Sequence, residues 1–396
     1  MRALSFFVRA TLLWCVALAL PGCIDPYMPD AISSTRSYLV VDGFINSRGI
    51  TTIILSRTYD IAANGTAPVE ARATLSIEEE GGTRHTLPES AVRGTYTSAA
   101  LTLNPTKKYR LHILTSTGKE YASNYVGFKN TPPIDDITWR TSATGLNIYV
   151  NTHDDTRQTQ YYRWEYEETW EINSPYKPVV EYKNGKMQDI TVPYPSACWV
   201  TSKSSDVKIS NTTRLSQDVV SDYLLRSYST TADRLRNRYS ILVKQYGQTQ
   251  EEYQYWELLK KNTENIGTLF DPLPAQLTGN VRCLNDDAEI TLGYIGVHSV
   301  EQKRIFISRP ELPGTWAIQS GYESCVPPDS IWIDRPAPPL PIPAQVYQAA
   351  FGSSSGYLPI EPIYGPTGVF QGYTAASKDC IDCRTRGTAV KPSFWP

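Results

Sequence analysis

The sequence predicts a mainly β protein: an N-terminal immunoglobulin-like β-sandwich followed by a larger β-rich α+β domain with helical insertions. The 396 residues include 26 Tyr and 28 Pro but only 20% charged residues, a composition typical of β proteins outside the cytoplasm. Short β-branched and alternating segments recur along residues 38–126, whereas helical patterns appear only later in the chain. Pro132 and Pro133 mark the expected boundary between the two domains.

Residues 1–22 have the pattern of a lipoprotein signal peptide. Arg2 and Arg9 form a short positive region before an apolar segment, residues 10–20, that is shorter than the roughly 20 residues needed to span a bilayer. The segment leads into the motif Leu-Pro-Gly-Cys ending at Cys23, which resembles the bacterial lipobox, whose cysteine is acylated. We therefore expect Cys23 to hold the protein on a membrane through its lipid, with residues 23–36 as a tether. The alternative is an ordinary secretory signal with an incidental cysteine.

Residues 37–130 contain several short candidate strands separated by turn signals, which is typical of an immunoglobulin-like sandwich. The segment 69–78 alternates apolar and polar residues, so we expect it to bury one face and expose the other. Gly81 and Gly82 then provide a turn, and residues 116–119 provide a hairpin loop.

Residues 131–310 mix strand patterns with helical ones, which predicts an α+β elaboration of a sandwich. Ser216 is an N-cap candidate for a helix over residues 217–225. Residues 249–252 form a capping box that opens a second helix over residues 253–261. Strand patterns resume after this helix, and we assign them to the same domain.

A long alternating segment, residues 161–172, is expected to carry aromatic residues on one of its two faces. Aromatic rings stack on sugars and on peptides, so this face is a candidate platform for a glycan or peptide ligand. A sandwich core is the alternative, because wide aromatic rows are common in such cores. The candidate ligand-stacking residues are Tyr162, Trp164, Tyr166 and Trp170.

Residues 311–396 are rich in proline and aromatic residues, and we expect an irregular tail that packs on the second domain. Cys15 leaves with the signal peptide and Cys23 carries lipid, so the remaining cysteines permit two disulfide bridges and one free thiol in an oxidising compartment. Cys380 and Cys383 could bridge each other or pair with distant cysteines, and their place in a tail disfavours a redox pair or metal site. The candidate disulfide cysteines are Cys198, Cys283, Cys325, Cys380 and Cys383.

The sequence offers no convincing catalytic, metal-binding or cofactor motif. Residues 352–356 match the letters of a nucleophile elbow around Ser354, but that motif needs a preceding strand and a following helix, and here a Pro/Gly/Ser loop surrounds it. His153, Asp154 and Asp155 could contact a cation, but they are more typical of a polar hairpin loop. The formal net charge of −2 provides no basic excess for nucleic acid. We therefore expect a non-enzymatic protein without metal, cofactor or nucleic-acid partner.

Several segments of the chain carry a family resemblance. They are residues 39–45, 238–246, 267–280, 292–295, 380–384 and 392–395. Together they resemble a family of Bacteroidota outer-membrane lipoproteins catalogued as a domain of unknown function (number 4249). The residues 386–388 depart slightly from the glycine pair usual in that family. The family supplies no settled catalytic residues, so the resemblance implies none here.

The resemblance also implies a location and a role. Genes of this family often stand beside TonB-dependent receptors, which implies an accessory role in nutrient uptake at the cell surface. Asp25 and Asp30 follow Cys23 and are similar to the acidic signal that sends such lipoproteins to the outer leaflet. We therefore expect an outer-membrane lipoprotein that assists a TonB-dependent receptor by binding ligand or by contacting the receptor. The alternatives are an adhesion or envelope-assembly module and, more remotely, a hydrolase that uses Ser354.

Overall fold

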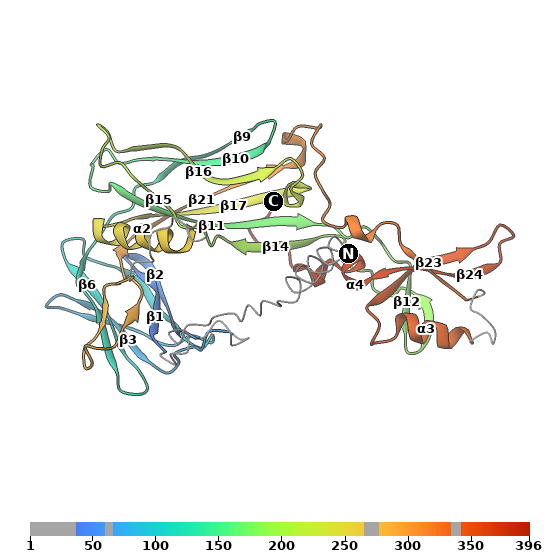
Figure 1. Ribbon diagram of the computed structural model, residues 1–396, viewed down its shortest axis with the longest axis horizontal. Helices are drawn as coiled ribbons and strands as arrows, with labels where there is room; N and C mark the ends of the chain where they lie inside the picture. Colours follow the sequence, from blue (N-terminus) through green and yellow to red (C-terminus); the bar gives the residue numbers. More distant parts are fainter. Residues whose placement is uncertain (1–36, 60–65, 265–276, 334–341) are drawn as a thin grey trace, which may run out of the picture.

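The computed structural model describes residues 37–59, 66–264, 277–333 and 342–396, and these form a mainly β protein (Figure 1). Their buried apolar residues gather in one core in an N-terminal sandwich, one in a central sandwich and a smaller one at the opposite end of the long axis. In this part of the chain, no helix combines the length and the apolar character needed to cross a membrane. The predicted signal peptide, Cys23 and the tether lie outside the described residues.

The N-terminal sandwich consists of two sheets whose alternating apolar residues meet in a common core. The first sheet contains β1 (Leu39–Asn46), β2 (Arg48–Arg57), β5 (Thr95–Thr102), β19 (Thr291–Leu292) and β20 (Val297–His298). The second sheet contains β3 (Thr74–Glu79), β4 (Arg84–Leu87), β6 (Lys108–Leu114), β7 (Glu120–Ser123), β8 (Val126–Gly127) and β18 (Val281–Cys283). The sandwich predicted for residues 37–130 is present, but it needs three further strands.

These three strands correct the assignment of residues 279–297 to the second domain. β19 and β20 pair in parallel with β1, and β18 pairs antiparallel with β7, with Val281 opposite Ser123. Without them, β1 and β7 would expose open edges with unpaired backbone groups. The chain therefore builds most of the N-terminal sandwich, forms the central strands, and then returns to cover both edges.

The central sandwich packs a three-stranded sheet on a five-stranded sheet (Figure 1). The smaller sheet contains β9 (Ile134–Thr141), β10 (Gly145–His153) and β16 (Val219–Ser229). The larger sheet contains β11 (Tyr161–Ile172), β14 (Cys198–Lys203), β15 (Lys208–Asn211), β17 (Arg238–Gly247) and β21 (Val300–Ser308). Two short 3₁₀ turns accompany these strands, η2 (Asp233–Leu235) and η3 (Arg309–Glu311).

Of the two predicted helices, one is confirmed and one is wrong. The capping box at residues 249–252 opens α2 (Gln250–Glu264), which lies between the central sheet and the N-terminal sandwich (Figure 1). Residues 219–229 instead form β16, which pairs with β10 along most of its length. The extended pairing and the burial of Val220 and Leu225 outweigh the local helix signal behind Ser216.

The smaller unit at the other end of the molecule is named the distal unit. It is made of β12 (Val180–Lys183), β13 (Lys186–Asp189), β22 (Asp329–Trp332), α3 (Pro343–Phe351), β23 (Tyr357–Tyr364), β24 (Phe370–Ser377) and α4 (Lys378–Ile381). The unit thus combines residues 180–189 with residues 329–381. The backbone N–H of Val179 donates to the carbonyl of Ile360 over 2.8 Å and joins these two segments. The short turns η4 (Glu323–Cys325) and η5 (Cys383–Thr385) lie beside them. The expectation of an irregular tail is therefore corrected, because these residues have their own sheet and core.

Two disulfides join the distal unit to itself and to the central sandwich. Cys325 pairs with Cys380, and Cys383 pairs with Cys198 at the start of β14. Cys283 is the free cysteine of the described residues and is buried, so it is removed from the disulfide candidates. The predicted pattern of two bridges and one thiol is confirmed, and of the pairings left open the distant ones are observed.

Candidate functional site

The aromatic row of β11 lies in the core of the central sandwich. Its candidate stacking residues are at most 8% exposed: Tyr162, Trp164, Tyr166 and Trp170. The even-numbered side chains of β11 face the smaller sheet, and the Trp164 indole N–H donates to Gln245 over 2.8 Å. Because the row is covered by β10 and β16, its proposed role as an exposed stacking platform is corrected to a structural one.

The opposite face of β11 lines a pocket of about 300 Å³ between the central sheet and the N-terminal sandwich. β1 contributes one wall, and β11, the end of β14 and β17 contribute the other. The lining residues are Asp42, Glu165, Tyr166, Glu167, Lys203, Ser204 and Lys244. Since the lining is mostly charged and of both signs, the pocket suits a small polar ligand better than an apolar one.

Strand register explains how the charges come together. In β11, Glu165 lies opposite Lys244 of β17, and Glu167 lies opposite Lys203 of β14. Directly opposite residues of antiparallel strands point to the same face, so these four side chains share one side of the sheet. Asp42 reaches the same space from β1.

The two glutamates already have cationic or hydroxyl partners. Arg163 forms an ion pair with Glu165, and the Tyr246 hydroxyl donates to the same carboxylate over 2.7 Å. Burial alone would raise the pKa of Glu165, but Arg163 and Tyr246 outweigh it, so the net pKa is lowered. Glu167 lies 3.8 Å from Arg304. Both glutamates therefore have basic partners within the protein itself.

Asp42, Lys203 and Lys244 differ from the glutamates, because none of them forms an ion pair with another described residue. The surrounding protein removes water from the Asp42 carboxyl, and this desolvation, followed by the charge of Glu165, raises its pKa. Lys203 and Lys244 nevertheless lie opposite Glu167 and Glu165 on the same face, and Asp42 and Lys203 are exposed to solvent.

A second pocket of about 300 Å³ lies where the distal unit joins the central sandwich. It is lined by Ser174, Tyr176, Lys177, Pro178, Pro193, Tyr194, Pro195 and Ser196. The Tyr176 hydroxyl donates to the backbone carbonyl of Cys325, and the Arg384 guanidinium lies 5.7 Å from the Tyr194 ring centroid. These contacts fix both rings next to the disulfides, so the pocket belongs to the joint that holds the distal unit.

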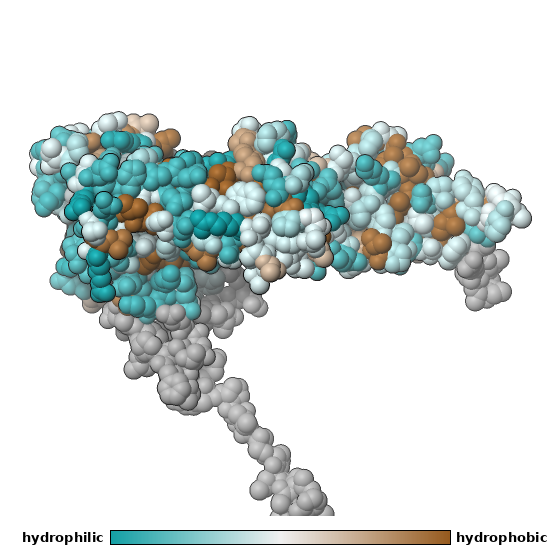
Figure 2. Space-filling model, turned by 90° about the horizontal axis from the view of Figure 1, so that it is seen from above, coloured by the Kyte–Doolittle hydropathy of each residue, from teal (hydrophilic) through white to brown (hydrophobic). Residues whose placement is uncertain are grey.

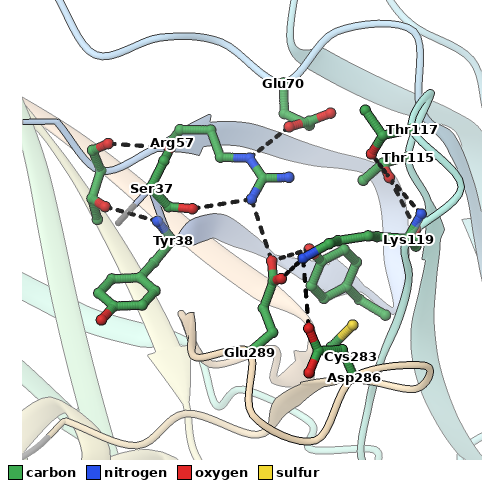
Figure 3. Close-up of polar contacts among 12 residues, drawn as sticks. Ser37, Tyr38, Arg57, Glu70, Thr115, Thr117, Lys119, Cys283, Asp286 and Glu289 are labelled. Atoms are coloured by element: carbon green, nitrogen blue, oxygen red, sulfur yellow. Dashed lines mark hydrogen bonds and ion pairs between the residues drawn. The ribbon is translucent and has the colours of Figure 1, made fainter. Parts of the chain in front are cut away.

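A cluster of ion pairs lies at the edge of the N-terminal sandwich, close to the first described residue (Figure 3). Arg57 donates to Glu70 over 2.7 Å and lies 3.4 Å from Glu289, which also pairs with Lys119. The Tyr121 hydroxyl donates to the same Glu289 carboxylate, and burial raises the pKa of Tyr121. This cluster fastens the segment before β19 to β2 and β7, so we assign it a structural role.

Ser354, the residue considered for a hydrolase, and the four histidines lie on different elements. Ser354 is exposed in the turn after α3, whereas His85 lies on β4, His112 on β6, His153 at the end of β10 and His298 on β20. No group of three or more metal-binding side chains is present in the described part of the chain. A strand does not lead into Ser354, so the context of a nucleophile elbow is also missing there.

Sequence reasoning did not identify the pocket between β1 and the larger central sheet, which is named the junction pocket. The alternation of residues 161–172 does put Glu165 and Glu167 on the face opposite the aromatic row, and the structure has them there. Asp42 and Lys203 carry no local signal, because each sits in an ordinary strand pattern and becomes notable only when distant strands meet.

Comparison with known proteins gives a family but no characterised relative. No curated protein has a matching sequence. A family model described as a domain of unknown function (DUF4249) matches residues 24–304, which include the N-terminal sandwich and nearly all strands of the central one. The match covers well over half of the chain, and the chain therefore belongs to this family of unknown function, DUF4249.

Proposed function

We propose that this protein is a lipid-anchored lipoprotein of a Bacteroidota outer membrane that assists a TonB-dependent nutrient receptor without catalysing a reaction. The lipobox-like motif at Cys23 and the sequence resemblance stated above support the anchor and the receptor. The two disulfides support an oxidising compartment outside the cytoplasm. In this proposal the lipid anchor is joined to the N-terminal sandwich, and the surface that contacts the receptor lies at the opposite end of the molecule.

The observation that carries the proposal is the placement of an apolar hairpin at the end opposite the N-terminal sandwich (Figure 1). The described chain begins at residue 37 in the sandwich, whereas the hairpin of β23 and β24 extends from the distal unit. Figure 2 shows apolar residues on the surface of this end of the molecule. A protein held at one end can present such a hairpin to a membrane-embedded partner.

The hairpin tip has the composition of a protein contact. Tyr364 and Val369 are 60% and 63% exposed, and no charged residue lies between Glu361 and Lys378. The Tyr364 ring packs edge-on against Phe370, with ring centroids 6.0 Å apart, so the tip is preorganised. Exposed aromatic and aliphatic groups on a rigid turn are the typical anchors of protein interfaces.

The test is a mild-detergent pull-down of the tagged full chain from its own outer membrane, read by mass spectrometry. We expect a TonB-dependent barrel to co-purify, and the double variant Tyr364→Ser/Val369→Ser to recover it at least about ten-fold less, the effect of losing ~1.4 kcal/mol of contact. Val92→Ser is the matched control, since Val92 is 67% exposed on the N-terminal sandwich.

Two outcomes would contradict the proposal. One is recovery of the protein alone or with envelope-assembly factors, which would favour the adhesion or assembly alternative. The other is unchanged nutrient uptake by the neighbouring receptor after deletion of the gene. Equal recovery of the barrel with the hairpin double variant and the control would keep the receptor but remove the hairpin from the contact.

A further inference from the structure

The pocket lined by Tyr176 and Tyr194, named the stem pocket, lies within a long hairpin of the chain. The pairing of β11 with β14 ends at Ile172 and Cys198, and pairing resumes farther along the hairpin at β12 and β13. Two stem segments, residues 173–178 and 191–197, connect these paired regions and supply the lining of the pocket.

Proline explains why the hairpin is open at this point. Each stem segment contains two prolines, and proline has no backbone N–H to donate across a hairpin. In the described chain the two segments share a single hydrogen bond, in which the Asn173 side-chain amide donates to the Ser196 carbonyl over 2.8 Å. The space between them is therefore not closed by a backbone ladder.

Two tyrosine rings form the aromatic walls of the stem pocket. The Tyr176 hydroxyl donates to the backbone carbonyl of Cys325 over 2.5 Å, and Tyr194 lies beside the Arg384 guanidinium. That guanidinium is itself held by Asp382 through hydrogen bonds of 2.8 and 2.9 Å. Both rings also pack against the core of the distal unit. The walls are therefore fixed before a ligand arrives.

The polar groups of the stem pocket are few. They are hydroxyls of Ser and Tyr and the ammonium of Lys177, and no carboxylate or side-chain amide is among the described lining residues. A sugar ring would find few partners here for its many hydroxyls. A ligand with apolar rings, no N–H donors of its own and carbonyl acceptors matches this lining better, because Tyr and Pro supply apolar contact and the hydroxyls can donate.

We propose that the stem pocket binds a proline-rich peptide segment in the polyproline II conformation, with an acidic residue beside its prolines. The proline rings pack against Tyr176 and Tyr194, and peptide carbonyls accept from the hydroxyls of Tyr194 and Ser196. The acidic residue pairs with the exposed Lys177. Polyproline II segments have no internal hydrogen bonds and lose little entropy on binding, so aromatic-lined grooves recognise them. This inference goes beyond the proposed function and gives the distal unit a second partner surface.

The test is fluorescence polarisation on the full chain in mild detergent, with a labelled peptide of two aspartates followed by ten prolines. We expect saturable binding of the all-L peptide and none of the all-D peptide, which has equal charge and apolarity but the opposite helix sense. Tyr194→Ala should weaken binding at least about ten-fold, the factor that corresponds to ~1.4 kcal/mol. Tyr59→Ala is the matched control, since Tyr59 is 46% exposed after β2 of the N-terminal sandwich.

Lys177 supplies a second variant that leaves the core untouched. Lys177→Met should weaken binding of the acidic peptide about three-fold at low salt, or ~0.6 kcal/mol, a size typical of exposed ion pairs. A peptide with asparagines in place of the aspartates should bind the wild type and Lys177→Met equally, because the charged contact is already absent. Lys186→Met is the control, because Lys186 is exposed on β13 outside the pocket.

The proposal is overturned if the all-L peptide does not bind, if both mirror forms bind alike, or if Tyr194→Ala and Lys177→Met bind like their controls while all variants unfold at the wild-type temperature. If Tyr194→Ala does not fold, Lys177→Met with the two peptides decides alone. Binding of a glucan oligosaccharide that depends on Tyr194, without binding of the peptide, would overturn it in favour of a sugar site. No receptor takes part in these titrations, so their failure and the failure of the uptake role can be told apart.

Discussion

At the scale of single residues, Asp154 shows how one carboxylate organises the turn between β10 and β11. Its Oδ1 accepts from the backbone N–H and the hydroxyl of Thr156 over 2.9 and 2.6 Å, and its Oδ2 accepts from the N–H groups of Gln158 and Thr159 over 3.1 and 2.9 Å. Burial alone would raise the pKa of Asp154, but these hydrogen bonds outweigh it and lower the pKa below its ordinary 3.8. The charged form is therefore favoured by the fold.

The sign of the pH dependence follows from this lowered pKa. Because the folded-state pKa lies below the unfolded value, the stabilisation is fully present above pH 3.8 and is lost as the pH falls through the folded pKa. Asp154→Asn keeps an acceptor but not the charge, so we expect its free energy of unfolding to fall by about 1 kcal/mol at neutral pH. Urea denaturation of both proteins across this pH range should show the difference shrinking in acid.

Asp155→Asn is the control for this prediction. Asp155 is the next residue, its side chain is 94% exposed, and its nearest basic group is His153 at 3.7 Å. We expect no measurable change in stability from it at any pH. A loss of stability in Asp154→Asn that stays constant in acid would show that shape, rather than charge, matters at this turn.

At the scale of elements, the sequence patterns correctly predicted those helices and strands that depend mainly on interactions between neighbouring residues. The capping box at residues 249–252 produced α2, and the alternation in residues 161–172 produced β11 with a buried and a polar face. The candidate helix at residues 217–225 became β16, because pairing with β10 is a non-local gain that propensity does not contain. The junction pocket was missed for the same reason, since Asp42 and Lys244 meet only through packing of two sandwiches.

The C-terminal segment is the element whose position depends most on covalent chemistry. After the disulfide between Cys383 and Cys198, Thr388 and Trp199 exchange backbone hydrogen bonds of 2.8 and 2.9 Å at β14. Trp395 is then 6% exposed and packs against Trp199 and Phe306. The segment thus pairs with the edge strand β14 and reaches β21 at the opposite edge of the sheet, and the disulfide sets where this cover begins.

Removal of this disulfide should loosen the cover. The double variant Cys198→Ala/Cys383→Ala frees a loop closed over 185 residues, and we expect the free energy of unfolding to fall by about 2–4 kcal/mol. Hydrogen exchange should rise at β14 and around Thr388 while β1 and β2 stay protected. Cys283→Ala is the control, because it removes a buried sulfur without breaking a bridge. Equal exchange changes throughout the protein would contradict a local role of the disulfide.

At the scale of the whole molecule, the units are not consecutive pieces of chain. The N-terminal sandwich takes its last strands from residues 281–298, after nearly all of the central strands have been formed. The buried pair Glu252 and His298, 3.4 Å apart, joins α2 to β20, and the ion pairs of Glu289 fasten the returning segment to β2 and β7 (Figure 3). The two sandwiches are therefore linked by chain crossings as well as by surface contact.

This interleaving predicts which fragments fold. A fragment of residues 37–131 lacks β18, β19 and β20, so its sheets keep open edges and its core loses Val281, Ile295 and Val297. We expect its circular dichroism spectrum to be that of an unfolded or aggregated chain, because open strand edges favour aggregation and the lost apolar burial lowers the stability of the fold. The same fragment joined through a Gly/Ser linker to residues 279–299 should regain a cooperative thermal transition. The joined fragment with Val281→Asp is the matched control and should lose that transition. Cooperative folding of residues 37–131 alone would show that the sandwich folds without β18, β19 and β20.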